Sequence, residues 1–401
     1  MHVWAAMVYW TGKVAGVLVA DTVKDRAGRL EYTTAGEGDG GRWRWFGARA
    51  WNAACLSAVA YRIVEETWPV TLLAVRRPRA SCYDTVCGGV WCVYACVYYS
   101  VAWLDRVSET VALAAAVTWR LRSTVDCLNS AVTGSGYLWV GDTEEFSHRD
   151  LPWHVYLTVV FPVVRFATAA VNEIPAPRDY GVWRTATAAL AAVASCSPVV
   201  AHGTAAALLA VANNSMRSIN RRIAALHVTA TVGRPLQGEG RLSEIARLAR
   251  KHWWTTELVT GRVCAAYGVD LMAAVLLAVL HVTYVAVSVF HCLTDDADDR
   301  TNIVSVPVAM QLVGWFGQFA YLAYTCDDLA NQSSEMFDNL NSLLLDIFKE
   351  CRLSGETYSS RTQEIEAVQE FLRQAVARKA VVHACGGLIK LNLSLITTVM
   401  Y

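Results

Sequence analysis

Residues 271–292 read LMAAVLLAVLHVTYVAVSVFHC, an apolar run without a single charged side chain. A helix that crosses a lipid bilayer needs about 20 mostly apolar residues. Three further runs of this kind occur, at 86–104, 187–212 and 303–325. Together the four runs predict four membrane-spanning helices.

Three weaker candidates raise the expected number of spans to seven. The first, 151–171, carries Arg165, which we expect to extend its guanidinium to the membrane interface. The second, around 45–75, is interrupted by charged residues, and the third, 380–401, carries Lys390 near its middle. The predicted fold is therefore all-α, a polytopic membrane protein with seven transmembrane helices.

The composition agrees with a membrane protein. Hydrophobic residues make up 54% of the 401 residues and charged residues only 17%. Trp (15) and Tyr (16) are plentiful, as expected where side chains gather at bilayer interfaces. Lys plus Arg and Asp plus Glu both number 35, so the net charge is zero. This balance argues against a nucleic-acid-binding protein, which would carry a basic excess.

The distribution of basic residues predicts the orientation. Connecting segments 1–48, 106–150, 213–263 and 326–379 together hold 25 of the 35 Lys and Arg residues. Cytoplasmic loops carry such an excess, so the N-terminus is predicted to be cytoplasmic.

This topology divides the chain into four parts. Residues 1–48 form a cytoplasmic N-terminal segment, and residues 49–325 hold spans one to six with cytoplasmic helical loops at 106–150 and 213–263. Apolar residues recur at helical spacing in 326–379, which predicts amphipathic cytoplasmic helices that pack together as an anchor. Residues 380–401 are predicted to begin a seventh helix.

Sequence signatures of catalysis are missing. No HExxH, GxSxG or Walker A pattern occurs, and the nine His residues are isolated from one another along the chain. The glycine-rich stretch 36–41 is acidic and has no following Lys-Ser/Thr, so we expect a loop there and not a phosphate site. We therefore expect no enzyme activity, no cofactor and no metal site.

The most specific motif lies near the C-terminus. It reads Ala384-Cys385-Gly386-Gly387-Leu388-Ile389-Lys390-Leu391-Asn392-Leu393-Ser394-Leu395-Ile396. This motif resembles the last-helix signature of insect gustatory receptors, A-C-G-x-F-x-L-[DN]-x-S-L-L. The segment at 9–18, YWTGKVAGVL, is similar to a short segment that precedes the first span in that family, and Tyr267-Gly268 opens the fifth span in a similar way.

The resemblance implies a subunit of a tetrameric ligand-gated cation channel in the plasma membrane of sensory neurons. The implied partners are a small-molecule tastant, the lipid bilayer, and further copies or other chemoreceptor subunits in a homo- or hetero-tetramer, with no nucleic acid. The last helix would line the pore, and the tastant would bind among spans two to six. The candidate ligand-binding residues are Trp91, Tyr94, His281, Tyr284 and Gln311. The residues assigned to the family motif at the start of the pore helix are Ala384, Cys385, Gly386, Asn392 and Ser394.

The sequence departs from the family pattern at two points. Position 388 is Leu where the family usually has Phe, and the family's T-Y-x-x-x-x-x-Q-F ending does not occur before Tyr401. Because hydrophobic gating residues belong to that ending, we expect a pore helix truncated at Tyr401 and no conduction by a homotetramer of this chain.

Three alternatives remain open. A G-protein-coupled receptor is faintly suggested by Asp105-Arg106-Val107, but this tripeptide follows the second span and no N-P-x-x-Y occurs. A transporter would show repeats or broken helices in matching halves, and neither is visible. A non-conducting modulatory subunit would fit the expected truncation. The sequence does not distinguish sugar, bitter and carbon dioxide ligands.

Overall fold

The computed structural model describes most, but not all, of the chain. The described residues are 3–16, 18, 20–24, 30–34, 41–76, 90–118, 120, 122–129, 155–173, 177–231, 238–294, 306–354, 358–384, 389–392 and 394–395.

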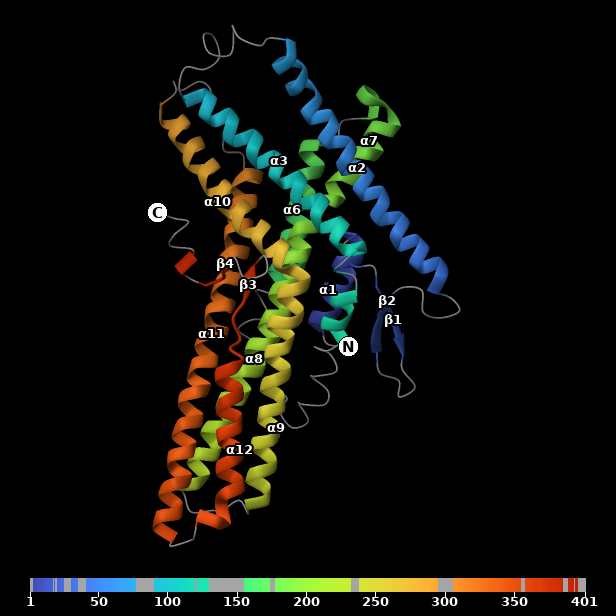
Figure 1. Ribbon diagram of the computed structural model, residues 1–401. Coiled ribbons are helices and arrows are strands. Elements are labelled where there is room, and N and C mark those ends of the chain that lie inside the picture. The colour runs from blue at the N-terminus through green and yellow to red at the C-terminus, as the bar shows by residue number, and fades with distance from the viewer. Residues whose placement is uncertain are drawn as a thin grey trace.

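The described chain is almost entirely helical, which confirms the predicted all-α class (Figure 1). In chain order the elements are α1 (Val3–Val14), β1 (Ala20–Lys24), β2 (Leu30–Thr34), α2 (Gly41–Arg76), α3 (Val90–Val117), the π-helical stretch η1 (Tyr156–Val160), α6 (Phe161–Glu173), α7 (Pro177–Ala194), α8 (Ser197–Thr231), α9 (Gly238–Thr256), the π-helical stretch η2 (Glu257–Val263), α10 (Cys264–Thr294), α11 (Val306–Ser354), α12 (Tyr358–Ala377), β3 (His383–Ala384) and β4 (Ile389–Lys390). The strands form two small antiparallel pairs, β1 with β2 and β3 with β4.

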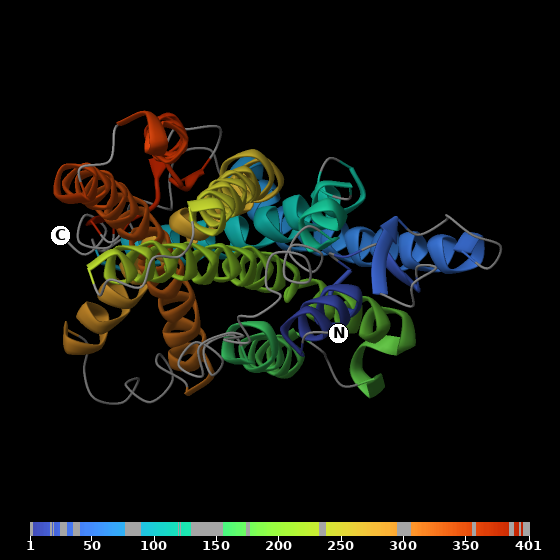
Figure 2. The same cartoon turned by 90° about the horizontal axis from the view of Figure 1, so that it is seen from below.

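Helix α8 runs through the middle of the bundle, as Figure 2 shows. Its first half is rich in Ala and Val and is buried almost throughout. Small side chains allow close approach of neighbouring helices: a Cβ added at Gly203 would lie only 3.1 Å from the carbonyl oxygen of Leu157 in η1. Within the described residues, the helical stretches Gly181–His227 and Gly240–Tyr284 are long and apolar enough to cross a membrane.

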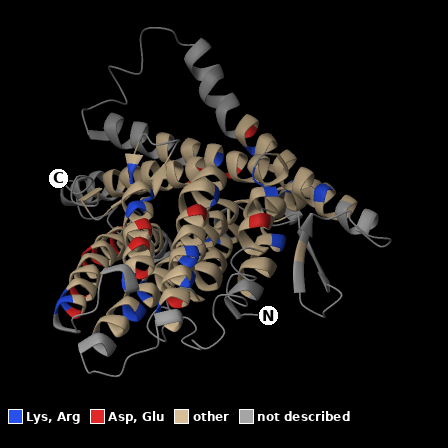
Figure 3. Ribbon diagram, turned by 60° about the horizontal axis from the view of Figure 1, so that its bottom comes forward, with Lys and Arg blue, Asp and Glu red and all other residues tan. Residues whose placement is uncertain are grey.

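A second, more polar bundle is formed by the C-terminal part of α8 with α9, α11 and α12 (Figure 1). Met336, Leu340 and Leu343 of α11 point into its core, together with Val368 and Phe371 of α12. Charged side chains gather along this end of the molecule (Figure 3). The amphipathic pattern predicted for 326–379 is thus present as packed helices.

The run at 303–325 lies within α11, which continues without interruption from Val306 to Ser354 and so joins this predicted span directly to the polar helix of the second bundle. One predicted helix boundary was wrong. The run at 187–212 is divided between α7 and α8, with turn residues Ser195 and Cys196 between them. Pro198 explains the break, since proline has no N–H to donate inside a helix but fits a helix's first turn.

The start predicted for the last helix at Ala380 also differs from the structure. The described residues between 378 and 392 are not helical, and His383 pairs with Lys390 in the β3–β4 ladder. A helical turn follows at 394–395. Hydropathy alone cannot separate an apolar extended segment from an apolar helix, whereas the two consecutive glycines at 386 and 387 disfavour a helix by about 1 kcal/mol each.

Candidate functional site

Four charged side chains from two helices meet inside the apolar bundle. The Arg165 Nη2 atom of α6 lies 3.1 Å from Asp105 Oδ2 and 3.8 Å from Glu109 Oε1, both on α3. Arg106 Nη1 lies 3.1 Å from Glu109 Oε2 one turn away. The expectation that Arg165 extends to the interface was therefore wrong: it is buried, because two carboxylates compensate its charge within the protein.

A cluster of aromatic and imidazole rings adjoins these charges. Trp315 of α11 lies at its centre and stacks on His281 of α10, with ring centroids 5.7 Å apart and an interplanar angle of 16°. His202 of α8 and Phe161 of α6 contact the same indole edge-on, at 5.9 and 5.6 Å. His281 also joins the ring cluster to the charges, because its Nε2 lies 3.6 Å from Asp105 Oδ1. We call His202, His281, Phe161 and Trp315 the ring cluster.

Close packing of α11 against α6 holds the ring cluster together. A Cβ added at Gly314 would lie 2.0 Å from Cε2 of Phe161, so only glycine leaves room for this ring. On its other side Phe161 lies parallel to Tyr156 of η1, with centroids 6.3 Å apart. Glycine at position 314 thus sets the position of a ring that contacts Trp315.

Several polar side chains around the ring cluster are buried and face one another in pairs. His202 interacts with the side chain of Gln318, and His281 Nε2 lies 3.6 Å from Asp105 Oδ1. Gln318 follows Trp315 by one turn of α11, and its amide nitrogen donates to the carbonyl of Val199 at 2.9 Å. These pairs link α8 to α11 and α10 to α3 inside the bundle.

A second buried ion pair lies further along the bundle. Arg120 Nη1 contacts Asp270 Oδ2 of α10 at 2.7 Å, and the guanidinium also donates to the carbonyl of Ala112. The guanidinium lies over the ring of Tyr267, 5.3 Å from its centroid, and the Tyr267 hydroxyl is 3.1 Å from Thr124 Oγ1.

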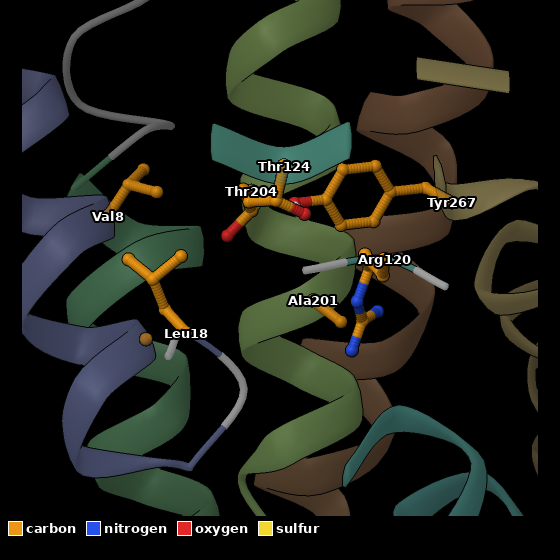
Figure 4. Close-up of a pocket in the computed structure, with 8 residues that line it drawn as sticks. Val8, Leu18, Arg120, Thr124, Ala201, Thr204 and Tyr267 are labelled. Carbon is orange, nitrogen blue, oxygen red and sulfur yellow. The ribbon is translucent and has the colours of Figure 1, made fainter. Parts of the chain in front are cut away.

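A small cavity lies beside this ion pair (Figure 4). Its lining residues come from the N-terminal segment, from α8, from α10 and from the chain after α3: Val8, Gly12, Leu18, Arg120, Thr124, Ala201, Thr204 and Tyr267. About 10 Å³ is open to the centre of a water-sized sphere, which is room for about one water molecule. The cavity is therefore too small for an organic ligand in this conformation.

The structure describes two of the five predicted ligand-binding side chains. His281 belongs to the ring cluster, and Tyr284 lies one turn further along α10 and is partly buried. The side chains of Trp91, Tyr94 and Gln311 lie outside the described part of the structure. Sequence reasoning missed Trp315, His202 and the pairing of Asp105, although a His within an uncharged run and an acidic residue at the end of a span were available signals.

The family-motif residues are described in part. Ala384 is fully buried in β3, whereas Cys385 and Gly386 lie outside the described residues. Asn392 Oδ1 accepts hydrogen bonds from the backbone N–H of Leu395 at 3.3 Å and from Ser394 Oγ at 2.7 Å. A side-chain oxygen that accepts from the third following N–H is the geometry of a helix N-cap. Asn392 therefore caps the helical turn at 394–395.

The second bundle connects to this C-terminal segment through α12. Arg378, just beyond α12, pairs with Glu257 of η2 at 3.3 Å and stacks over the ring of Trp253. Gln374 donates to the carbonyl of Ala249 at 2.8 Å and lies 3.1 Å from Nδ1 of the buried His252. Burial, with a contribution from the Arg378 guanidinium, lowers the pKa of His252 to about 4. His252 is therefore neutral at neutral pH.

Within the described residues, no group of three His, Cys, Asp or Glu side chains is placed to hold a metal ion. The site offers buried rings and balanced charges in the apolar part of the bundle.

Comparisons with known proteins agree with this architecture. The sequence model of the family described as 7tm chemosensory receptors matches residues 119–400. No curated protein sequence matches the chain. Among solved structures, the insect olfactory receptor OR5 from Machilis hrabei, determined in complex with eugenol, is similar, with a TM-score of 0.63. The likeness covers 99% of this chain and 94% of that chain at 10% sequence identity, and so concerns the fold alone.

Proposed function

Because the chain belongs to the 7tm chemosensory receptor family, we propose that it is a gustatory receptor, one subunit of a tetrameric ligand-gated cation channel that responds to a small-molecule tastant. The family places it among multi-pass membrane chemoreceptors. Taste as the modality, the tetramer and the plasma membrane of sensory neurons are parts of the proposal.

The observation that carries the proposal is the ring cluster. Four rings from α6, α8, α10 and α11 meet in the apolar part of the bundle, next to buried polar side chains. Buried rings with a few convergent polar groups are typical of small-molecule sites. Movement of a ligand here would act on four helices at once.

Support for taste, as opposed to smell, comes from the C-terminal motif. The fold is shared with an olfactory receptor and so does not separate the two modalities. The sequence from Ala384 to Leu395 resembles the last-helix signature of gustatory receptors, and Asn392 at its [DN] position caps a helical turn. This match favours the gustatory branch.

In the proposed channel the last helix would begin after Asn392 and face a central pore. The bundle of α8, α9, α11 and α12 would anchor the subunits on the cytoplasmic side, consistent with the basic excess in 213–263 and 326–379. Ligand-driven movement of α10 could reach the last helix through β3, which packs against α10.

Calcium influx in cultured cells tests the modality and the channel together. The chain would be expressed with a conducting chemoreceptor subunit and exposed to separate panels of sugars, bitter compounds and volatile odorants. We expect influx to at least one tastant that does not activate the partner subunit alone. Responses confined to volatile odorants would favour an olfactory role, and silence to all panels would contradict the proposal.

A further inference from the structure

We infer that the cavity beside the Arg120–Asp270 pair binds one ordered water molecule. The water bridges the Thr204 hydroxyl to the hydroxyl pair of Thr124 and Tyr267. This inference concerns a buried hydrogen-bonded link between segments of the chain and does not depend on the proposed function. It follows from the size of the cavity, from the hydrogen-bonding capacity of its polar wall and from the segment that forms its apolar wall.

The polar wall of the cavity offers both a hydrogen-bond donor and an acceptor. Thr124 Oγ1 and Tyr267 Oη lie 3.1 Å apart, and one hydroxyl proton is used between them. Whichever hydroxyl donates, the other keeps a proton that it can donate elsewhere. The Thr204 hydroxyl donates to the carbonyl oxygen of Val200 at 2.8 Å, so its own oxygen can still accept. A water molecule can accept the first bond and donate the second.

The three hydroxyl-bearing side chains converge from separate parts of the chain (Figure 4). Thr204 lies on α8, Tyr267 on α10 and Thr124 after α3, and all three line the cavity. Arg120 lines it as well and carries five N–H donors, of which its described bonds use two. A buried water makes two to four hydrogen bonds, and the cavity has room for about one such molecule.

The apolar wall of the cavity comes from the N-terminal segment. Val8 and Leu18 lie opposite the hydroxyl groups (Figure 4), and both are buried. Leu18 is held there because its backbone N–H donates to the carbonyl of Gly12 at 3.0 Å. A Cβ added at Gly12 would lie 2.8 Å from the Leu18 Cβ, so glycine permits this close return of the chain. The N-terminal segment therefore folds back against the cavity and covers this side of it.

The bound water extends a chain of buried polar groups that begins at the ring cluster. His202 interacts with the side chain of Gln318 and with the backbone of Asp270. The Asp270 carboxylate pairs with Arg120, which lines the cavity. The water therefore continues this chain from α11, α8 and α10 to the place that the N-terminal segment covers.

Synchrotron X-ray footprinting of the full chain in lipid nanodiscs tests the site. Radiolysis of a bound water produces hydroxyl radicals where the water lies, so a buried aromatic ring beside it is oxidised although bulk solvent does not reach that ring. Tyr267 and Tyr32 are both 2% exposed, and of the two only Tyr267 lines the cavity. We expect the Tyr267 ring to be oxidised at least fivefold faster than the Tyr32 ring in the unchanged chain.

Two substitutions at position 204 separate the hydroxyl from the shape of the side chain. Thr204→Val keeps the branched shape and removes the acceptor, and it should reduce the oxidation rate of Tyr267 to about that of Tyr32. Thr204→Ser keeps the hydroxyl and should keep most of the excess at Tyr267. The thermal unfolding midpoint of each variant shows whether it is folded.

Either of two results would overturn the inference. The first is a Tyr267 ring that is oxidised no faster than the Tyr32 ring. This comparison needs no substitution and so stands even if a variant fails to fold. The second is an excess at Tyr267 that persists undiminished in a folded Thr204→Val variant, because bulk solvent and not a water held by Thr204 would then cause the oxidation.

Discussion

Arg120 and Asp270 form a buried ion pair that joins the chain after α3 to α10, with Nη1 and Oδ2 2.7 Å apart. Their side chains are only 1% and 3% exposed. The pair lies beside the water-sized cavity, and its guanidinium lies over the Tyr267 ring. It therefore holds α10 in place, the helix that carries His281 of the ring cluster and packs against β3.

Removing one charge of this pair should destabilise the protein strongly. Asp270→Asn leaves the Arg120 charge buried and uncompensated, which typically costs about 3–5 kcal/mol. Thermal unfolding in nanodiscs should show a clearly lower midpoint, whereas Asp126→Asn, at an exposed carboxylate, should not. Recovery of stability in an Arg120→Met/Asp270→Leu double variant would identify the unpaired charge as the cause. An unchanged midpoint in Asp270→Asn would contradict the structure.

A methyl group at position 314 should disturb the ring cluster. Gly314→Ala places a Cβ 2.0 Å from the Phe161 ring, which must move away from Trp315. Such overpacking costs about 1–3 kcal/mol. We expect a lower unfolding midpoint and an agonist response that requires at least tenfold more ligand.

Gly317→Ala is the matched control on the same helix, since a Cβ there meets no atom within 4 Å. Equal behaviour of the two variants would show that the contact between α6 and α11 does not shape the site.

The N-cap at Asn392 should govern the start of the last helix. Asn392→Ala removes the acceptor for the Leu395 N–H and should destabilise that helix by about 0.5–2 kcal/mol. Asn392→Asp keeps an acceptor and should behave like the original chain. Amide hydrogen exchange around 394–395 measures the change directly. Equal protection in the Ala and Asp variants would rule out the cap.

Acid should weaken the second bundle through His252. The pKa of this imidazole is lowered from an ordinary value of 6.5 to about 4 by burial, so folding favours its neutral form. Its contribution to stability is fully present above pH 6.5 and is lost as the pH falls from 6.5 toward 4, by about 3 kcal/mol in all. Unfolding midpoints between pH 7.5 and 4 should fall, and His252→Gln should remove part of that fall. An identical pH profile in the variant would exclude His252 as the titrating group.

The proposed orientation predicts where glycans can be attached. Asn331-Gln332-Ser333 is an acceptor sequence on a segment that we place in the cytoplasm, so it should remain unmodified in cells. Asp299→Asn creates an acceptor sequence with Arg300 and Thr301 in a segment that we place outside. A glycosidase-sensitive mass shift should appear only in the second case, and modification of Asn331 would reverse the orientation.

The sequence predicts the helices well but not their internal contacts. Uncharged runs such as 271–292 specify membrane helices directly, because length and hydropathy are local properties. The partners of buried charges are not local: Asp105 and Arg165 are 60 residues apart, and Arg120 and Asp270 are 150 residues apart. Because the partner of a buried charge lies on another span, the sequence of one span does not explain that charge. This is why Arg165 was wrongly expected at the membrane interface.

The candidate site, like the buried ion pairs, could be predicted from the sequence only in part. His281 could be found as a polar residue within a span, but its stacking partner Trp315 depends on how α10 meets α11. The absence of helix before Asn392 was missed, since the apolar residues there satisfy the hydropathy of a helix equally well. The glycines at 386 and 387 and the capping oxygen of Asn392 are the signals against a helix that starts at Ala380.

Single-particle electron cryomicroscopy of the chain purified in lipid nanodiscs tests the central claim most directly. The account predicts four copies around one axis, with the segment that starts at Asn392 nearest the axis and the bundle of α8, α9, α11 and α12 packed between copies on one side of the membrane. A monomer, or an assembly in which that segment lies at the periphery, would contradict a tetrameric channel subunit.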